Sequence, residues 1–236
     1  MHEASEVVMV NYKKVVMIFL GLIFLMIMII SAGDLVYTSV NPHILFAGSA
    51  MIIEIVIMAI AGFIGVIVLS PAFTSKHKRK TFQKGVLIIA FLVYLTILIT
   101  ILFGKAVYLR NIAYAPSVGL KGRISDANII PFRTISIYIY ALSKHTINLS
   151  IILDNLLGNF VLFMPMGLFL PCLVPVSRKK HYLIVVITLL LIEIAQLFTG
   201  RGIFDIDDIM LNFAGFLIAY IIVNSSFVKK ITNKFL

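Results

Sequence analysis

Six long, continuous runs of apolar residues are the feature that most restricts what this chain can fold into. They occupy residues 15–32, 44–69, 86–103, 149–174, 182–198 and 209–223. A helix needs about 20 apolar residues to cross the hydrocarbon core of a bilayer, and these runs are close to that length. Because the runs do not alternate in polarity, they do not resemble membrane-spanning strands. We therefore expect an all-α, polytopic transmembrane helical bundle with six spans.

The composition leaves too few polar residues to coat a soluble domain of this size. Hydrophobic residues make up 61% of the 236-residue chain and charged residues 13%, and the mean hydropathy is +1.09. Long apolar stretches in such a chain are typical of transmembrane helices. We therefore expect a multi-pass protein of the plasma membrane.

Lys and Arg residues give the chain a net charge of +10, and they are unevenly distributed along it. If the N-terminus is inside, 13 of the 20 basic residues fall on the cytoplasmic side, beside the ends of the apolar runs. The positive-inside rule then predicts that both termini are cytoplasmic and that segment 104–148 is outside. Basic clusters next to spans attract anionic headgroups, so we expect membrane lipids, and not nucleic acid, as partners.

Polar and ionisable residues gather between the last two apolar runs, on the predicted outer side. The stretch 193–212 contains Glu193, Gln196, Arg201, Asp205, Asp207, Asp208 and Asn212. Ionisable groups at the edge of a bilayer are costly and usually have a function. Asn212 follows Asp208 by four residues, so both would lie on one face of a helix. We therefore expect a functional site in this stretch.

The fourth apolar run contains a second polar group near its predicted outer end. Asn155 and Asn159 are four residues apart and share one helix face. Pro165 and Pro171 follow, and we expect them to kink the helix and release backbone carbonyls for neighbouring polar side chains. Two roles stay open for the Asn pair: it belongs to the outer site, or it only holds neighbouring helices together.

The long outer segment 104–148 differs from a simple linker. It contains Asn128-Ile-Ile-Pro131-Phe132, and Tyr138 and Tyr140 come shortly after. Tyr is typical of the headgroup boundary of a membrane. One interpretation is a surface or re-entrant piece that contributes to the site. The other is an interfacial helix without a ligand.

These separated positions, taken in order, resemble the VanZ family of bacterial membrane proteins. The residues that carry the resemblance are Asn128, Pro131, Phe132, Asn155, Asn159, Phe163, Pro165, Gly167, Glu193, Gln196, Arg201, Asp205, Asp208, Asn212 and Gly215. The resemblance covers residues 86–223, which suggests an N-terminal helix pair in 1–84, a VanZ-like four-helix domain in 85–224 and a basic cytoplasmic tail in 225–236. It implies an integral membrane protein associated with resistance to glycopeptides, teicoplanin especially, in Gram-positive bacteria, but no settled biochemical activity.

Together, the resemblance and the polar residues predict a site for an outer-leaflet lipid or a lipid-linked wall precursor. The expected ligand-binding residues are Asn128, Asn155, Asn159, Glu193, Gln196, Arg201, Asp205, Asp208 and Asn212. The guanidinium of Arg201 is suited to phosphate or carboxylate, and the amides are suited to sugar or peptide groups. The alternative is an internal ion-pair network in which Arg201 pairs with Glu193 or an aspartate.

We therefore expect a non-enzymatic protein of the cell envelope that has no cofactor. Three further alternatives stay open beside this prediction. Asp205, Asp207 and Asp208 offer the oxygen ligands that Mg²⁺ and Ca²⁺ prefer, so a divalent cation site is one of them. Paired carboxylates would also suit a membrane enzyme acting on lipid-linked phosphates, although no known catalytic motif accompanies them. Glu54, near the middle of the second run, would suit a small-solute transporter. The sequence leaves the oligomeric state open.

Overall fold

A computed structural model describes residues 2–40, 48–69, 75–109 and 119–226 of the chain. Within these ranges the regular secondary structure is helical, which confirms the all-α prediction. The helices are α1 (His2–Val40), α2 (Gly48–Leu69), α3 (Lys76–Leu109), α4 (Leu120–Asp126), α5 (Arg133–Ser143), α6 (Leu149–Leu162), α7 (Met164–Leu173), α8 (Arg178–Thr199) and α9 (Ile206–Asn224).

Five helical segments in the described part of the chain are long and apolar enough to cross a membrane. They lie in α1, in α3, in α6 together with α7, in α8 and in α9. Helix α2 covers the second apolar run, but only Ile60–Leu69 of it is found there as a shorter apolar helix. Membrane-spanning helices are therefore supported, whereas the number of six spans and the cytoplasmic termini stay predictions.

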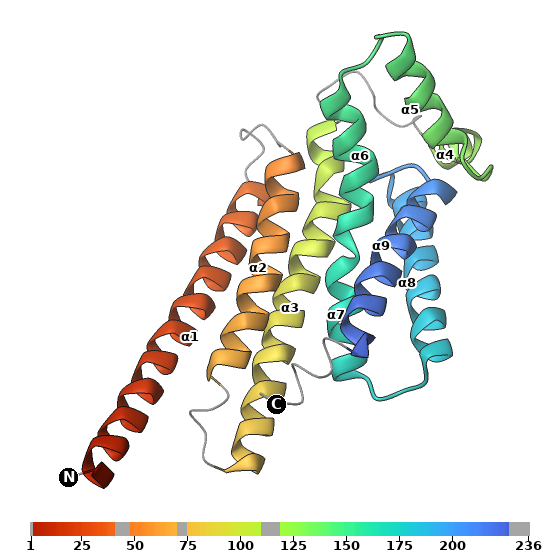
Figure 1. The fold of residues 1–236 in the computed structure, drawn as a ribbon. Coiled ribbons are helices and arrows are strands. Elements are labelled where there is room, and N and C mark those ends of the chain that lie inside the picture. The colour runs from red at the N-terminus through yellow and green to blue at the C-terminus, as the bar shows by residue number, and fades with distance from the viewer. Residues whose placement is uncertain (1, 41–47, 70–74, 110–118, 227–236) are drawn as a thin grey trace.

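The long helices lie side by side, and the two short helices α4 and α5 sit at one end of them (Figure 1). Helices α1 and α2 form one edge of the bundle and α8 lies at the opposite edge, with α3, α6, α7 and α9 between them. Helix α1 begins, and α9 ends, at the end away from α4 and α5. We call the end that carries α4, α5, the start of α6 and the start of α9 the polar end.

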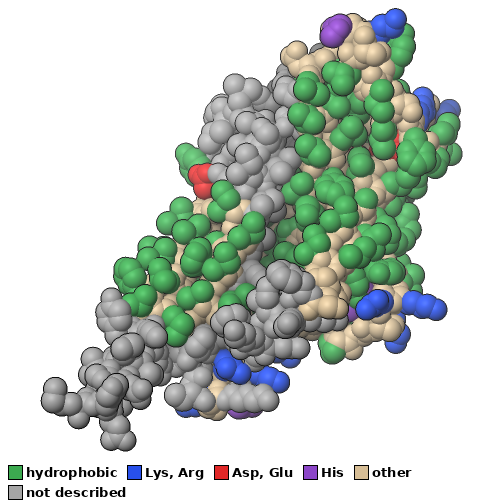
Figure 2. Space-filling view, in the orientation of Figure 1, with side chains coloured by type: hydrophobic (Ala, Val, Ile, Leu, Met, Phe, Trp, Pro, Cys, Tyr) green, Lys and Arg blue, Asp and Glu red, His purple; other side chains and the backbone are tan. Residues whose placement is uncertain are grey.

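Large apolar side chains cover the outside of the bundle. Phe19, Ile89 and Leu191 are examples from α1, α3 and α8, and all three are exposed. Figure 2 shows hydrophobic side chains over the visible face, with Lys and Arg gathered toward its ends. A soluble monomer rarely exposes an apolar surface of this extent, whereas lipid is its natural solvent in a membrane.

The fourth predicted span is divided at Phe163 into α6 and α7. Pro165 lies in the first turn of α7, where its missing N–H interrupts the hydrogen bonding of a continuous helix. The hydroxyl of Tyr94, on α3, donates to the carbonyl oxygen of Leu162 at 3.0 Å in the buried core. The kink expected at Pro165 thus takes the form of a division between two helices, and a polar side chain satisfies a nearby carbonyl as expected. Pro171 lies inside α7 without dividing it.

Two glycines let α9 pack directly against the backbone of α6 and α7. A Cβ atom on Gly215 would collide with the carbonyl oxygen of Phe160, and one on Gly167 would collide with that of Phe216. Close approach at small residues is a common way for helices to associate within a membrane. This contact holds the first half of α9 beside the second half of α6, where Asn159 and Asp208 meet.

Candidate functional site

Residues far apart in the sequence are joined at the polar end by a short parallel bridge between Asn128 and Asp205. The backbone N–H of Asn128 donates to the carbonyl of Phe204 at 2.8 Å, and the N–H of Ile206 donates to the carbonyl of Asn128 at 2.9 Å. The Asn128 side chain also donates from Nδ2 to Oδ1 of Asp205 at 2.8 Å. The segment before α5 is thus fastened to the start of α9.

Asp205 is the centre of this connection. It is the N-cap of α9, and its Oδ1 accepts the backbone N–H of Asp207 at 2.8 Å, as N-cap side chains commonly do. Its Oδ2 accepts the hydroxyl of Thr134 at 2.5 Å, and its own backbone N–H donates to Oε2 of Glu193 at 3.0 Å. Both carboxylate oxygens therefore serve internal hydrogen bonds, and the residue as a whole joins α5, α8 and α9.

Asp207 caps a different helix from the one that carries it. Its side chain is completely buried, and its Oδ1 accepts the N–H of Phe132 at 2.5 Å while its Oδ2 accepts the N–H of Ile135 at 3.1 Å. These N–H groups belong to the N-cap and the first turn of α5, where a helix has no internal acceptors for them. A carboxylate is favourable at this end of a helix, so Asp207 stabilises α5 in its docked position.

The carboxylates considered as cation ligands do not form a cluster of the expected kind. Among the described residues, no group of three or more His, Cys, Asp or Glu side chains is arranged to hold a metal ion. Asp205 and Asp207 direct their oxygens at hydrogen-bond donors instead. A cation site stays an untested alternative.

A second polar cluster lies where α6 meets α9, and it consists of Asn159, Asp208 and Asn212. Nδ2 of Asn159 donates to Oδ1 of Asp208, and Nδ2 of Asn212 donates to the backbone carbonyl of Asp208 at 2.7 Å. Asn212 is only 3% exposed, yet its side-chain oxygen has no hydrogen-bond partner among the described residues. An unsatisfied buried acceptor costs about 1–3 kcal/mol, so this oxygen is the atom of the cluster that still lacks a donor among the described residues.

Three predicted site residues use their described hydrogen bonds elsewhere. Asn155 donates to the carbonyl of Ile151 in its own helix at 2.7 Å. Gln196 and Arg201 both donate to backbone carbonyls near the end of α3, at 3.0 Å and 2.9 Å respectively. The Arg201 side chain is exposed, and it forms no ion pair with Glu193 in the described structure. A pair between Arg201 and Glu193 is therefore not found among the described residues, and a pair between Arg201 and an aspartate stays a prediction.

Two contributors to this end of the bundle were not predicted from the sequence. Thr134 lies in the first turn of α5, and nothing in the neighbouring sequence indicates that its hydroxyl donates to Asp205. Arg123, on α4, donates from Nη2 to the carbonyl of Phe198 at 3.1 Å. A cation at the C-terminal end of α8 complements the partial negative charge of that end, but only the packing of α4 on α8 brings it there.

The side chain of Glu54, the residue that suggested a small-solute transporter, lies outside the described residues. The transporter alternative therefore stays a prediction.

Comparison with known proteins identifies one family. The model of the VanZ/LLP1 family matches residues 91–228, which is more than half of the chain and runs from within α3 past the end of α9. Helices α1 and α2 precede the match. No curated protein and no solved structure matches the chain.

Proposed function

The chain belongs to the VanZ/LLP1 family, and from this premise we propose that it lowers susceptibility to glycopeptide antibiotics such as teicoplanin. In this proposal the polar end faces the outside of the cell membrane. There it engages the polar part of an outer-leaflet lipid or of a lipid-linked wall precursor. The role is one of binding, and it needs no cofactor.

The observation that carries the proposal is the unpaired side-chain oxygen of Asn212. The Asn212 side chain is buried, and it forms a cluster with the half-buried Asn159 and Asp208 where α6 meets α9. Buried polar groups are almost always hydrogen-bonded in folded proteins, so an acceptor without a partner indicates a position for a donor that is not part of the chain. Hydroxyl, amine and amide groups of sugars and peptides are donors of this kind.

The exposed guanidinium of Arg201 supports the choice of ligand class. One of its donors is used on the carbonyl of Phe103, at 2.9 Å. An arginine has five N–H donors in a planar arrangement, so the others can meet a phosphate. A lipid-linked wall precursor offers both chemistries in one molecule, namely phosphate beside the membrane and amide or hydroxyl donors beyond it.

A matched pair of substitutions on α9 tests the proposal. Asn212 and Asn224 lie on the same helix, and each donates from Nδ2 to the backbone carbonyl four residues earlier, at 2.7 and 2.9 Å. Asn224 is at the opposite end of α9 from the polar cluster. Asn212→Leu should therefore abolish both protection against teicoplanin and binding of a labelled wall precursor, while Asn224→Leu should retain both at equal membrane abundance.

The measurements are the minimal inhibitory concentration of teicoplanin in a susceptible Gram-positive host and equilibrium binding of the precursor to purified protein in nanodiscs. Protection by the Asn212→Leu variant equal to that of the parent would contradict the assignment of the site. Protection lost equally in both variants would show that the effect comes from the helix and not from the polar cluster.

A further inference from the structure

The turn formed by residues 129–132, which we call the apolar turn, carries an exposed hydrophobic surface at the polar end. We propose that this turn inserts into the headgroup region of the outer phospholipid leaflet and anchors α4 and α5 at the membrane surface. The inference concerns a different surface from the Asn212 cluster and does not depend on the proposed resistance function.

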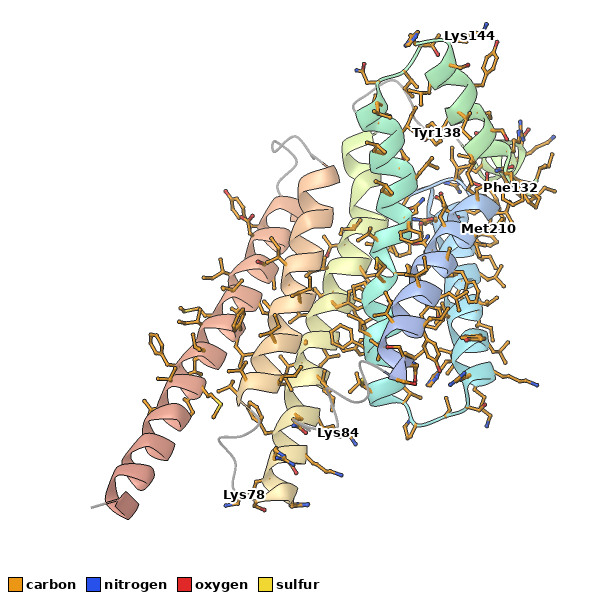
Figure 3. The ribbon with its side chains drawn as sticks, in the orientation of Figure 1. Lys78, Lys84, Phe132, Tyr138, Lys144 and Met210 are labelled. Carbon is orange, nitrogen blue, oxygen red and sulfur yellow. The ribbon has the colours of Figure 1, made fainter. Side chains whose placement is uncertain are left out.

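Three of the four side chains in the apolar turn are large, apolar and strongly exposed. Ile129 is 73% exposed, Ile130 57% and Phe132 56%. Contiguous apolar side chains on a protein surface indicate an interaction site for another apolar phase. Figure 3 shows Phe132 at the margin of the bundle, beyond the ends of α8 and α9 and next to α4.

The backbone of the apolar turn is held in an unusual conformation that directs these side chains outward. Phe132 has φ 64°, in the left-handed region that aromatic residues seldom adopt. The N–H of Phe132 is fixed by the buried carboxylate of Asp207, and the N–H of Ile130 donates to Oδ1 of Asn128 at 3.1 Å. A rigid turn held from below by buried polar groups, with apolar side chains above, is suited to insertion.

The position of the apolar turn points to lipid as the occupant. Helix α4 is attached to the end of α8 by the bond from Arg123 to the carbonyl of Phe198, and the side chains of Phe198 and Ile124 are 62% and 57% exposed. Helix α8 is a candidate span, so the apolar surface at its end continues from the lipid-facing surface of the bundle toward α4 and the turn. Insertion of the turn would extend that surface into the interface.

Charge around the apolar turn fits the same occupant. Lys121 and Arg133 are exposed on either side of it in the sequence, where they can meet the phosphates of anionic lipids. Tyr140 is 65% exposed on α5, and tyrosine is favoured at the membrane–water boundary. Figure 2 shows hydrophobic and basic side chains close together in this region.

The chain contains no tryptophan, so a single introduced tryptophan reports its own surroundings. Ile129→Trp and Phe132→Trp each place one in the apolar turn, and Lys144→Trp, just past the other end of α5, is the matched control. Figure 3 places Phe132 and Lys144 at opposite ends of α5. The full chain is reconstituted into vesicles of phosphatidylglycerol and phosphatidylcholine, with or without bromine at known depths of the acyl chains.

Position 129 lies outside the left-handed part of the turn, so Ile129→Trp tests the proposal even if Phe132→Trp does not fold. We expect the tryptophan in the apolar turn to emit at shorter wavelength and to lose emission to shallow bromines, whereas the one introduced by Lys144→Trp stays accessible to iodide in water. Emission from the turn that iodide quenches and bromine does not would overturn the proposal. So would protection from both quenchers that depends on protein density, because a second copy would then cover the turn.

Discussion

The buried carboxylate of Asp207 provides the most direct test of how the polar end is held together. It accepts two N–H groups at the start of α5, from Phe132 and Ile135, and no part of its side chain is exposed. Asp207→Ala removes both acceptors. Asp207→Asn keeps the shape and one acceptor, but it turns an NH₂ group toward the other N–H.

The magnitude follows from the number and type of these bonds. A hydrogen bond to a charged group contributes about 1.5–3 kcal/mol, so two of them hold α5 with about 3–6 kcal/mol. Water can solvate the start of α5 once it opens, so we take the lower value, about 3 kcal/mol, as the expected loss for Asp207→Ala. Since about 1.4 kcal/mol is a factor of ten, local opening becomes about 100-fold more frequent in Asp207→Ala and about tenfold more frequent in Asp207→Asn.

Hydrogen–deuterium exchange of the protein in nanodiscs measures this opening directly. The amides of α5 should exchange faster in the order parent, Asp207→Asn, Asp207→Ala, while the amides in the middle of α9 keep their parental rates. Ser136→Ala, at an exposed position of α5, is the control for a change on the helix that leaves the cap intact. Parental exchange of α5 in Asp207→Ala would refute the capping role.

Two further predictions concern the packing of the bundle. Gly215→Ala should lower the thermal unfolding midpoint in detergent, by an amount equivalent to about 1–3 kcal/mol, because the new Cβ meets the carbonyl of Phe160. Gly85 in α3 has open space around it, so the control Gly85→Ala should instead stabilise the protein by about 0.5–1 kcal/mol. Equal effects of the two substitutions would argue against the close contact at Gly215. Tyr94→Phe should cost about 1–3 kcal/mol in the same melt because it leaves the buried carbonyl of Leu162 without its donor, and an unchanged midpoint would mean that the carbonyl finds another partner.

Some of the polar end could be predicted because it depends on position along the helices. Successive helices cross a membrane in alternating directions, so the order of the apolar runs shows which helix ends lie on the same side. Asn159 and Asp208 could be assigned to one side in this way. A kink of the fourth span near Pro165 could also be predicted, since the missing N–H of a proline acts within one turn. Both predictions use only local or one-dimensional properties of the chain.

The partners of individual side chains could not be predicted in this way. In the sequence Asp207 is one of three equivalent acidic residues, but in the structure it is the acceptor for a helix start 75 positions earlier in the chain. Gln196 and Arg201 were assigned to the ligand site, but their described bonds are to the end of α3. Which donors a side chain meets depends on the rotation of each helix about its axis, and hydropathy contains little information about that rotation.

The membrane class, the positions of the apolar helices, a kink in the fourth span and the family could all be read from the sequence. The class and the helix positions follow from the cost of unpaired backbone groups in lipid, which every residue of a span experiences in the same way. The kink follows from the missing N–H of Pro165, and the family follows from the order and spacing of separated residues. Three further features could be seen only in the folded chain: Asp205 and Asp207 hold the polar end together, the oxygen of Asn212 has no partner among the described residues, and the side chains of residues 129–132 are exposed. The physical reason is that these outcomes depend on how closely α9 approaches α6 at Gly215 and on the docking of α5, both of which join segments far apart in the chain.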